Sequence, residues 1–250
     1  MIREHLLHIL AYEWITFGAC WASFNLLFNR GDAAQTQRSR HIRFTFLAIT
    51  FLILFLERHA IPPIALIVLG LIWGAVSLRW AAPTQAAHSG EFPLYRLLRL
   101  VILAITFALL FWNQTAIGIL GRGFAPLSPA LAVAGFTIGS AGLAVALWAR
   151  LHLGQYWSDK VVVQAGHQLI RTGPYARLRH PIYSGVLLGV VGTALVLDEW
   201  RGAIAFLLLL TNYAVKARKE DRILAESFGA QFQEHRQRAG FLLPRLRVRE

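Results

Sequence analysis

The chain has 250 residues, of which 56% are hydrophobic and only 15% charged, and its mean hydropathy is +0.50. This composition excludes an ordinary water-soluble globular domain and is typical of a membrane protein. The formal net charge of +12 does not call for nucleic acid as a partner, because basic residues beside a bilayer attract anionic membrane lipids. The single cysteine, Cys20, excludes an intrachain disulfide and a cysteine-based zinc site.

Apolar segments follow one another along the chain, each of about 17 residues or more and so long enough to cross roughly 30 Å of hydrocarbon. They are residues 5–28, 41–57, 61–80, 95–113, 127–149, 182–200 and 201–217. The first is longer than the hydrophobic region of a signal peptide and has no clean cleavage site behind it, so we expect it to be retained. The sequence therefore predicts an all-α protein, a polytopic bundle of about seven transmembrane helices.

Lysine and arginine are distributed unevenly between the two sides of this predicted bundle. Of the 25 Lys and Arg residues, 21 lie in the loops at 29–43, 79–99 and 150–181 or after residue 214. The remaining four are Arg3, Arg58, Arg122 and Arg201. Positively charged loops remain in the cytoplasm. We therefore predict an integral protein of a bacterial inner membrane with its N-terminus outside and its C-terminus in the cytoplasm.

Polarity changes along the chain and divides it into two parts, with no internal repeat or low-complexity linker between them. Residues 1–126 are apolar helices without a chemical motif, and residues 127–250 form a second part with three sections. These sections are a cytoplasmic connector at 150–181, a helix pair at 182–217 and a tail at 218–250. The connector is rich in residues that can pack, which favours a functional loop over a disordered one.

The tail has apolar residues at near-helical spacing among charges. They are Ile223, Leu224, Phe228 and Phe232. This pattern predicts an amphipathic helix at 222–236, either on the membrane surface or packed under the connector.

The most informative stretch is GHQLIRTGPY at 166–175, followed by RHPIYSG at 179–185. Pro181 is tolerated in the first turn of a helix, and the spare N–H groups there suit an anionic group such as a carboxylate. His180 and Tyr183 would add hydrogen-bond donors and flat rings that suit an adenine. This helix start is therefore a candidate binding site at the cytoplasmic mouth of the bundle.

These blocks, with LHLGQYWS at 151–158 and the pattern K-x3-ED-x2-L-x3-FG at 216–229, resemble the isoprenylcysteine carboxyl methyltransferase family of integral membrane methyltransferases. The phospholipid N-methyltransferases are more distantly similar. The resemblance covers about residues 127–244 and implies an enzyme that uses S-adenosylmethionine. It implies a cofactor pocket lined by Gln164, His167, Gln168, Leu169, Ile170, Tyr175, His180, Pro181, Ile182 and Tyr183, which Glu220 reaches from the tail. Lys216 and Glu220 are the implied catalytic residues.

The chain departs from the family pattern at the position that would hold the methyl acceptor. Lys216 stands where the family usually has an arginine for the acceptor carboxylate, and lysine lacks the bidentate fork of arginine. Asp221 replaces a common second glutamate, and Phe232 and His235 stand where tyrosines are frequent. A carboxylate on a prenylcysteine-like or other lipid-like acceptor is the first expectation, and a small thiol or a phospholipid amine is the alternative on the same scaffold.

More distant interpretations are an NADPH-dependent membrane reductase, a small-molecule transporter and a structural membrane protein. The chain lacks the paired broken helices typical of transporters. We expect no metal, because His167 and His180 have neither a cysteine partner nor HExxH spacing. Glu220 could also be a solvated charge paired with Lys216. Glu13 could be functional or could simply reach water from its helix.

Overall fold

The structure, a computed structural model, describes residues 2–28, 93–112, 115–125, 128–156 and 168–245. Every regular element in this part of the chain is helical. The α-helices are α1 (Ile2–Phe28), α4 (Pro93–Phe111), α5 (Pro129–Leu153), α6 (Pro181–Leu197) and α7 (Trp200–Arg238), and the short 3-10 helices are η2 (Gly118–Gly121), η3 (Gly154–Tyr156) and η4 (Gly173–Ala176). The all-α prediction is confirmed for this part, whereas the predicted segments at 41–57 and 61–80 lie outside the described residues.

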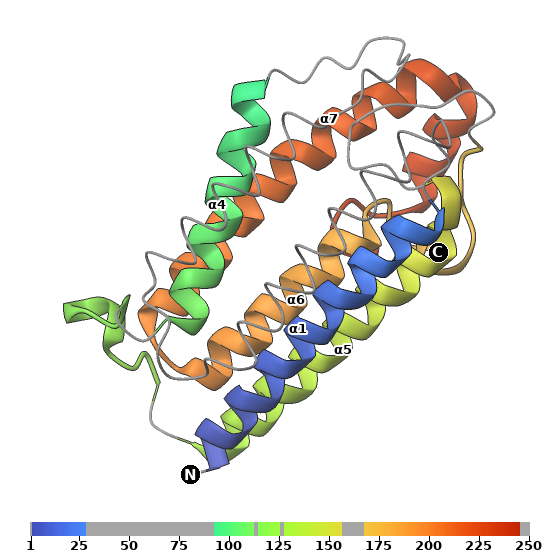
Figure 1. The fold of residues 1–250 in the computed structure, drawn as a ribbon. Coiled ribbons are helices and arrows are strands. Elements are labelled where there is room, and N and C mark those ends of the chain that lie inside the picture. The colour runs from blue at the N-terminus through green and yellow to red at the C-terminus, as the bar shows by residue number, and fades with distance from the viewer. Residues whose placement is uncertain (1, 29–92, 113–114, 126–127, 157–167, 246–250) are drawn as a thin grey trace.

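The helices form two groups that meet along α6 and α7. Helices α1, α5 and α6 lie side by side, and α4 lies against α7 (Figure 1). By length and composition α5 could cross a membrane, and Leu97–Phe111 and Pro181–Leu197 are shorter apolar helices. The predicted segments 95–113, 127–149 and 182–200 thus correspond closely to α4, α5 and α6.

Glycines bring α5 and α6 into close backbone contact. A Cβ atom added at Gly142 would lie 2.6 Å from the carbonyl oxygen of Gly185, and one added at Gly185 would lie 2.6 Å from the backbone nitrogen of Ala146. Such distances leave no room for a side chain. The glycine pairs 135/139 and 185/189 lie in this interface, so helix packing explains their small-xxx-small spacing.

Helix α1 is held to this pair by polar contacts inside an apolar interface. The indole Nε1 of Trp14 donates to Thr193 Oγ1 at 3.0 Å, and Ser140 donates through Oγ to Glu13 Oε1 at 3.0 Å. The second carboxylate oxygen of Glu13 is also buried. Glu13 therefore faces α5, which disfavours the interpretation that it simply reaches water.

The predicted break between the last two apolar segments is confirmed. Helix α6 ends at Leu197, and Asp198 adopts a left-handed conformation with φ 51° before α7 begins at Trp200. Asp and Asn tolerate this conformation better than most residues, since their short polar side chains can form local hydrogen bonds. The carboxylate of Asp198 also makes a long-range contact, since its Oδ1 accepts a hydrogen bond from the backbone N–H of Ala125 at 3.2 Å.

The predicted tail helix at 222–236 is helical, but it does not begin separately after residue 217. Helix α7 continues from Trp200 to Gly229, where φ 49° and ψ −121° produce a kink, and a second helical stretch runs from there to Arg238. The charged stretch after Lys216 consists largely of good helix formers, so a change in polarity does not end the helix. Glycine can adopt the positive φ of the kink without a Cβ clash. Within α7, the buried side chains beyond the kink are those of Phe232 and His235.

The chain after α7 returns to the beginning of α6. The backbone N–H of Arg179 donates to Gly240 O at 2.8 Å, and the N–H of Gly240 donates to Arg177 O at 3.0 Å. Ser184 Oγ donates to Leu242 O at 2.7 Å. These bonds tie the end of the connector, the first turn of α6 and the C-terminal segment 239–242 into one unit.

Candidate active site

His180 joins the start of α6 to α7. It is the residue that precedes the first turn of α6, and only 5% of its side chain is exposed. Its Nε2 lies 2.9 Å from Asp221 Oδ1, and its Nδ1 lies 3.5 Å from Glu220 Oε2. Consecutive carboxylates of α7 therefore contact both nitrogens of one imidazole ring.

Glu220 is also contacted by α6 and by its own helix. Tyr183 donates its hydroxyl to Glu220 Oε1 at 2.7 Å, and Lys216 Nζ lies 3.8 Å from the same oxygen, one turn earlier in α7. The side chain of Glu220 is 20% exposed. The predicted pairing with Lys216 is confirmed, whereas the interpretation of Glu220 as a solvated charge is wrong, because three side chains enclose it.

Aromatic rings form a stack beside these charges. The ring of Tyr183 lies between those of His180 and Tyr213, with centroid distances of 5.6 Å and 4.6 Å and interplanar angles of 9° and 28°. Lys216 Nζ lies 5.5 Å from the centroid of the Tyr183 ring, and Phe241 meets His180 edge-on. A positive charge over an aromatic face is attracted by its quadrupole. The stack thus offers flat surfaces and keeps the ammonium of Lys216 close to Glu220.

The charges of the site hold one another in their ionised forms. Burial alone would lower the pKa of His180, but its hydrogen bonds to Asp221 and Glu220 raise the pKa above the ordinary value for histidine. Burial alone would raise the pKa of Glu220, yet the hydrogen bond from His180 and the charge of Lys216 lower it. The electrostatic environment therefore favours an imidazolium beside two carboxylates.

An apolar cluster adjoins the charged one through consecutive residues of α6. Tyr175, from η4, packs with Ala149 and Ile182, and Ile170 covers this cluster. Burial and the charge of Glu220 raise the pKa of Tyr175 well above the ordinary range, so its phenol is neutral. Since Ile182 directly precedes Tyr183, the connector and the charged cluster meet at the first turn of α6.

The structure brings most of the predicted site residues together. His180, Tyr183, Lys216 and Glu220 form the charged cluster, and Ile170, Tyr175 and Ile182 form the apolar one. Pro181 opens α6 and is buried, Leu169 is half-buried and Gln168 is exposed. Gln164 and His167 lie outside the described residues.

Three residues of the site were missed as site residues by sequence reasoning. Asp221 contacts His180 and also lies 3.2 Å from Arg179 Nη2, and Tyr213 and Phe241 contribute rings. The position of Tyr213, three residues before Lys216 on a helix, could have placed it on the same face. No sequence signal indicates that the C-terminal segment brings Phe241 back to His180.

Known proteins resemble the part of the chain that carries this site. Residues 134–226 match the isoprenylcysteine carboxyl methyltransferase (ICMT) family. This match confirms the resemblance predicted from the two sequence blocks. A protein-S-isoprenylcysteine O-methyltransferase B from Arabidopsis thaliana is 36% identical over 80 residues, which cover 32% of this chain and 41% of the relative.

The cobalt-zinc-cadmium resistance protein CzcN of Cupriavidus metallidurans is 32% identical over 111 residues, which cover 44% of this chain and 49% of the relative. Each match thus spans about half or less of the curated relative's length. A solved structure of a eukaryotic intramembrane Ras methyltransferase, ICMT, is 18% identical with a TM-score of 0.47, over 97% of this chain and 96% of that one.

Proposed function

We propose that the chain is an integral membrane methyltransferase that uses S-adenosylmethionine to methylate a carboxylate of a prenylcysteine-like or other lipid-like acceptor at the cytoplasmic face of the membrane. The observation that carries the proposal is the convergence of His180, Tyr183, Lys216 and Glu220 within the stretch that matches the ICMT family. The name of the Arabidopsis relative supports the same reaction class.

The residues present fit the cofactor. S-adenosylmethionine carries an adenine, a carboxylate, an ammonium and a cationic sulfonium. Glu220 provides a partly exposed negative charge, and the rings of His180 and Tyr183 provide flat faces. The first turn of α6 has no side-chain cap from His180, so its N–H groups suit an anionic group. When bound, the cofactor supplies an electrophilic methyl group.

The protein's own contribution is orientation and exclusion of water. An acceptor carboxylate is already ionised at neutral pH and needs no general base. The acceptor oxygen would take the methyl group that the bound cofactor supplies, and the cofactor sulfur would leave as a neutral thioether, so the residues of the site would not have to move a proton. Lys216 would hold the acceptor, and His180 would keep Glu220 ionised and in place. Alignment of this kind provides most of the rate enhancement expected from such a site.

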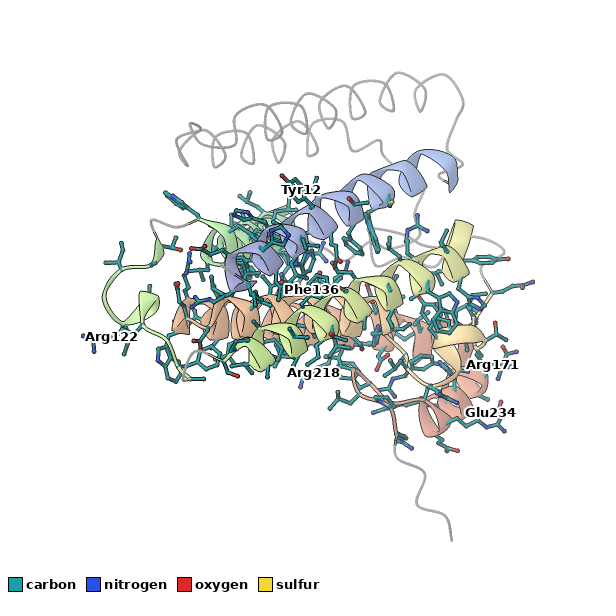
Figure 2. All side chains as sticks on the ribbon, turned by 90° about the horizontal axis from the view of Figure 1, so that it is seen from below. Tyr12, Arg122, Phe136, Arg171, Arg218 and Glu234 are labelled. Atoms are coloured by element: carbon teal, nitrogen blue, oxygen red, sulfur yellow. The ribbon has the colours of Figure 1, made fainter. Side chains whose placement is uncertain are left out.

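Location in a membrane is supported by the apolar faces of the helices. Helix α5 is long and apolar enough to cross a bilayer, and α4 exposes Leu94, Leu98 and Ile105 by 75%, 53% and 45%. Arg122 lies at the end of the molecule opposite Arg171 and Glu234 (Figure 2). Reporter fusions after residue 250 and within the 113–127 loop should report opposite compartments. The same compartment for both would contradict the orientation.

Binding of S-adenosylhomocysteine to the detergent-purified chain tests the cofactor directly. His180→Ala and Glu220→Ala should each weaken binding about 5- to 150-fold, because each removes a buried or charged hydrogen bond worth roughly 1 to 3 kcal/mol. Arg222→Ala is the matched control, since Arg222 is exposed near the same end of α7. Calorimetry that gives wild-type affinity for both site variants would contradict the proposed pocket.

A further inference from the structure

The last turn of α5 contacts the short helix that carries Tyr175. This short helix, η4, packs against α5 (Figure 1). A hydrogen bond joins His152 Nε2 of α5 to Thr172 Oγ1, the residue before η4, at 2.8 Å. The imidazole of His152 is also nearly parallel to the phenol ring of Tyr175, with centroids 6.5 Å apart and an interplanar angle of 22°. One histidine of α5 therefore contacts the residues on both sides of the Gly173–Pro174 step.

The hydroxyl of Thr172 serves this tertiary contact instead of its own helix. A threonine directly before a helix commonly caps the first turn through its side chain. Within the residues that the structure describes, the Thr172 side chain makes no capping bond to η4. Its hydroxyl pairs instead with His152, 20 residues earlier in the chain. The contact therefore fixes where η4 begins relative to α5, which a local cap would not do.

Gly173 allows the imidazole ring to lie directly on the backbone of this turn. Its φ is 57°, and a Cβ atom added to it would lie 2.7 Å from Cε1 and 2.8 Å from Nε2 of His152. Glycine is the residue that combines this backbone conformation with so close an approach. The position of the His152 ring and the position of η4 therefore depend on each other.

The same turn holds residues that we expect to line the cofactor pocket. Ile170 precedes Thr172 and Tyr175 follows it, and both pack in the apolar cluster with Ile182. Ile182 belongs to the first turn of α6, where this apolar cluster adjoins the charged one. A movement of η4 away from α5 would separate Ile170 and Tyr175 from Ile182, and would open the apolar wall beside the charged cluster.

We propose that His152 is a positioning residue for the cofactor, because its hydrogen bond to Thr172 holds η4 against α5 in the arrangement that binds S-adenosylmethionine. This inference rests on the proposed function and adds to it a residue outside the predicted pocket. His152 acts through Thr172 and η4, so it contributes to cofactor affinity and not to the methyl-transfer step. Loss of the bond leaves a smaller fraction of the chain in the binding-competent arrangement, and the apparent affinity decreases in proportion to that fraction.

The test measures the affinity of the full-length chain in nanodiscs for S-adenosylhomocysteine by calorimetry. His152→Phe keeps a flat ring but loses the hydrogen bond, and Thr172→Val keeps the shape of the side chain but loses the hydroxyl. Each should weaken binding about 3- to 10-fold, the loss expected of one hydrogen bond. The double variant should bind no more weakly than either single variant, because both changes remove the same bond. His152→Gln and Thr172→Ser, which keep a hydrogen-bonding group at the contact, should stay closer to wild type.

Kinetics separate positioning of the cofactor from catalysis. His152→Phe should raise KM for S-adenosylmethionine by a factor similar to its effect on S-adenosylhomocysteine binding, while kcat at saturating cofactor stays close to wild type. Thr137→Val is the matched control, because Thr137 is exposed on α5 and its hydroxyl bonds within its own helix, to Val133 O at 2.9 Å. This control should leave both KM and affinity unchanged.

Each outcome decides the proposal. A wild-type chain that binds S-adenosylhomocysteine while both single variants match its affinity overturns the role of His152 and leaves the proposed function intact, even if the variants have a lower Tm. A lower kcat with unchanged KM in His152→Phe also overturns this role. If His152→Phe does not fold, judged from thermal unfolding, Thr172→Val decides, because it leaves the imidazole in place. A wild-type chain that does not bind S-adenosylhomocysteine refutes the proposed function and this role of His152 with it.

Discussion

The two ends of the α6–α7 pair both contain buried charges, but the charges have different partners. At the end opposite the site, Arg201 donates through Nη1 to Trp112 O at 2.7 Å and through Nε to Glu199 Oε2 at 2.6 Å. Arg3 donates through Nε to Val196 O at 3.0 Å. At the site end, His180 and Glu220 contact mainly other side chains.

The difference in partners indicates that the cluster around Arg201 is structural and the cluster around His180 is functional. Carbonyls at the C-terminal ends of helices have no partner within their own helix, and an arginine that binds them satisfies a permanent requirement of the fold. Side chains that bind one another can exchange partners when a ligand arrives. We therefore expect substitutions at the Arg201 end to change mainly stability, and substitutions at the His180 end to change mainly binding and turnover.

The largest effect on stability is expected for Arg201→Ala. The side chain is 3% exposed, and its removal leaves Glu199 and the carbonyl of Trp112 without this donor. Breaking a buried ion pair in this way typically costs about 3 to 5 kcal/mol. Thermal unfolding in detergent measures the change, with the exposed Arg222→Ala as control. Equal effects on Tm for both variants, or lost affinity for S-adenosylhomocysteine in an Arg201→Ala variant that remains folded, would remove the distinction between the two ends.

The second-largest effect is expected for Lys216→Ala, and it concerns catalysis rather than stability. If the acceptor is a carboxylate, Lys216→Ala should lower kcat/KM about 10- to 150-fold, because a hydrogen bond to a charged group is worth roughly 1.5 to 3 kcal/mol, while cofactor affinity stays close to wild type. Lys216→Arg should retain or raise activity.

Steady-state kinetics with a prenylcysteine analogue and with a simple thiol check both Lys216 variants. An unchanged kcat/KM for Lys216→Ala with the carboxylate would exclude the role of Lys216. Higher turnover of the thiol by this variant would favour the small-thiol alternative, because a neutral nucleophile gains nothing from a nearby cation.

The site end should also respond to pH, because the pKa values of His180 and Glu220 are shifted in opposite directions. The raised pKa of His180 contributes stability that is complete below about pH 6.5 and is lost as the pH rises through the raised value. The lowered pKa of Glu220 contributes stability that is complete above about pH 4.5 and is lost as the pH falls through the lowered value. This pair therefore adds most to stability between about pH 4.5 and 6.5.

A double variant isolates the contribution of this pair to the pH profile. The difference in Tm between wild type and His180→Gln/Glu220→Gln should be largest within the window and should decrease on both sides. Taking the difference reduces the opposing effect of His235, whose pKa is lowered mainly by burial and by the charges of Arg171 and Arg179. If the difference in Tm between wild type and the double variant does not vary with pH, His180 and Glu220 do not form an ionised pair.

The smallest effect is expected for Ser184→Ala. It removes the 2.7 Å hydrogen bond that holds Leu242 against α6, and one such bond contributes about 1 kcal/mol. We expect a small decrease in Tm and faster amide hydrogen exchange after residue 238. Thr211→Ala is a suitable control, because Thr211 bonds only within its own helix, to Leu207 O. Equal rates of amide hydrogen exchange after residue 238 in the two variants would show that Ser184 does not hold the C-terminal segment against α6.

Local features of the sequence were sufficient to predict the helical segments that the structure describes and the break near Trp200, since both depend on hydropathy at short spacing. Most of the site was also predictable. His180 and Tyr183 lie in one motif, and Lys216 and Glu220 lie one helical turn apart in another, so each pair shares a helix face before any fold is known.

The tertiary structure alone decided which faces meet. It placed Asp221 on His180, returned Phe241 to the start of α6 and brought α4 against α7 through Asn212. It also placed the break within α7 at Gly229, whereas the change in polarity had predicted a break near residue 217. The physical reason is the same in each case. Hydropathy and spacing specify the faces of single helices, but the rotation and order of packed helices depend on contacts between residues far apart in the chain.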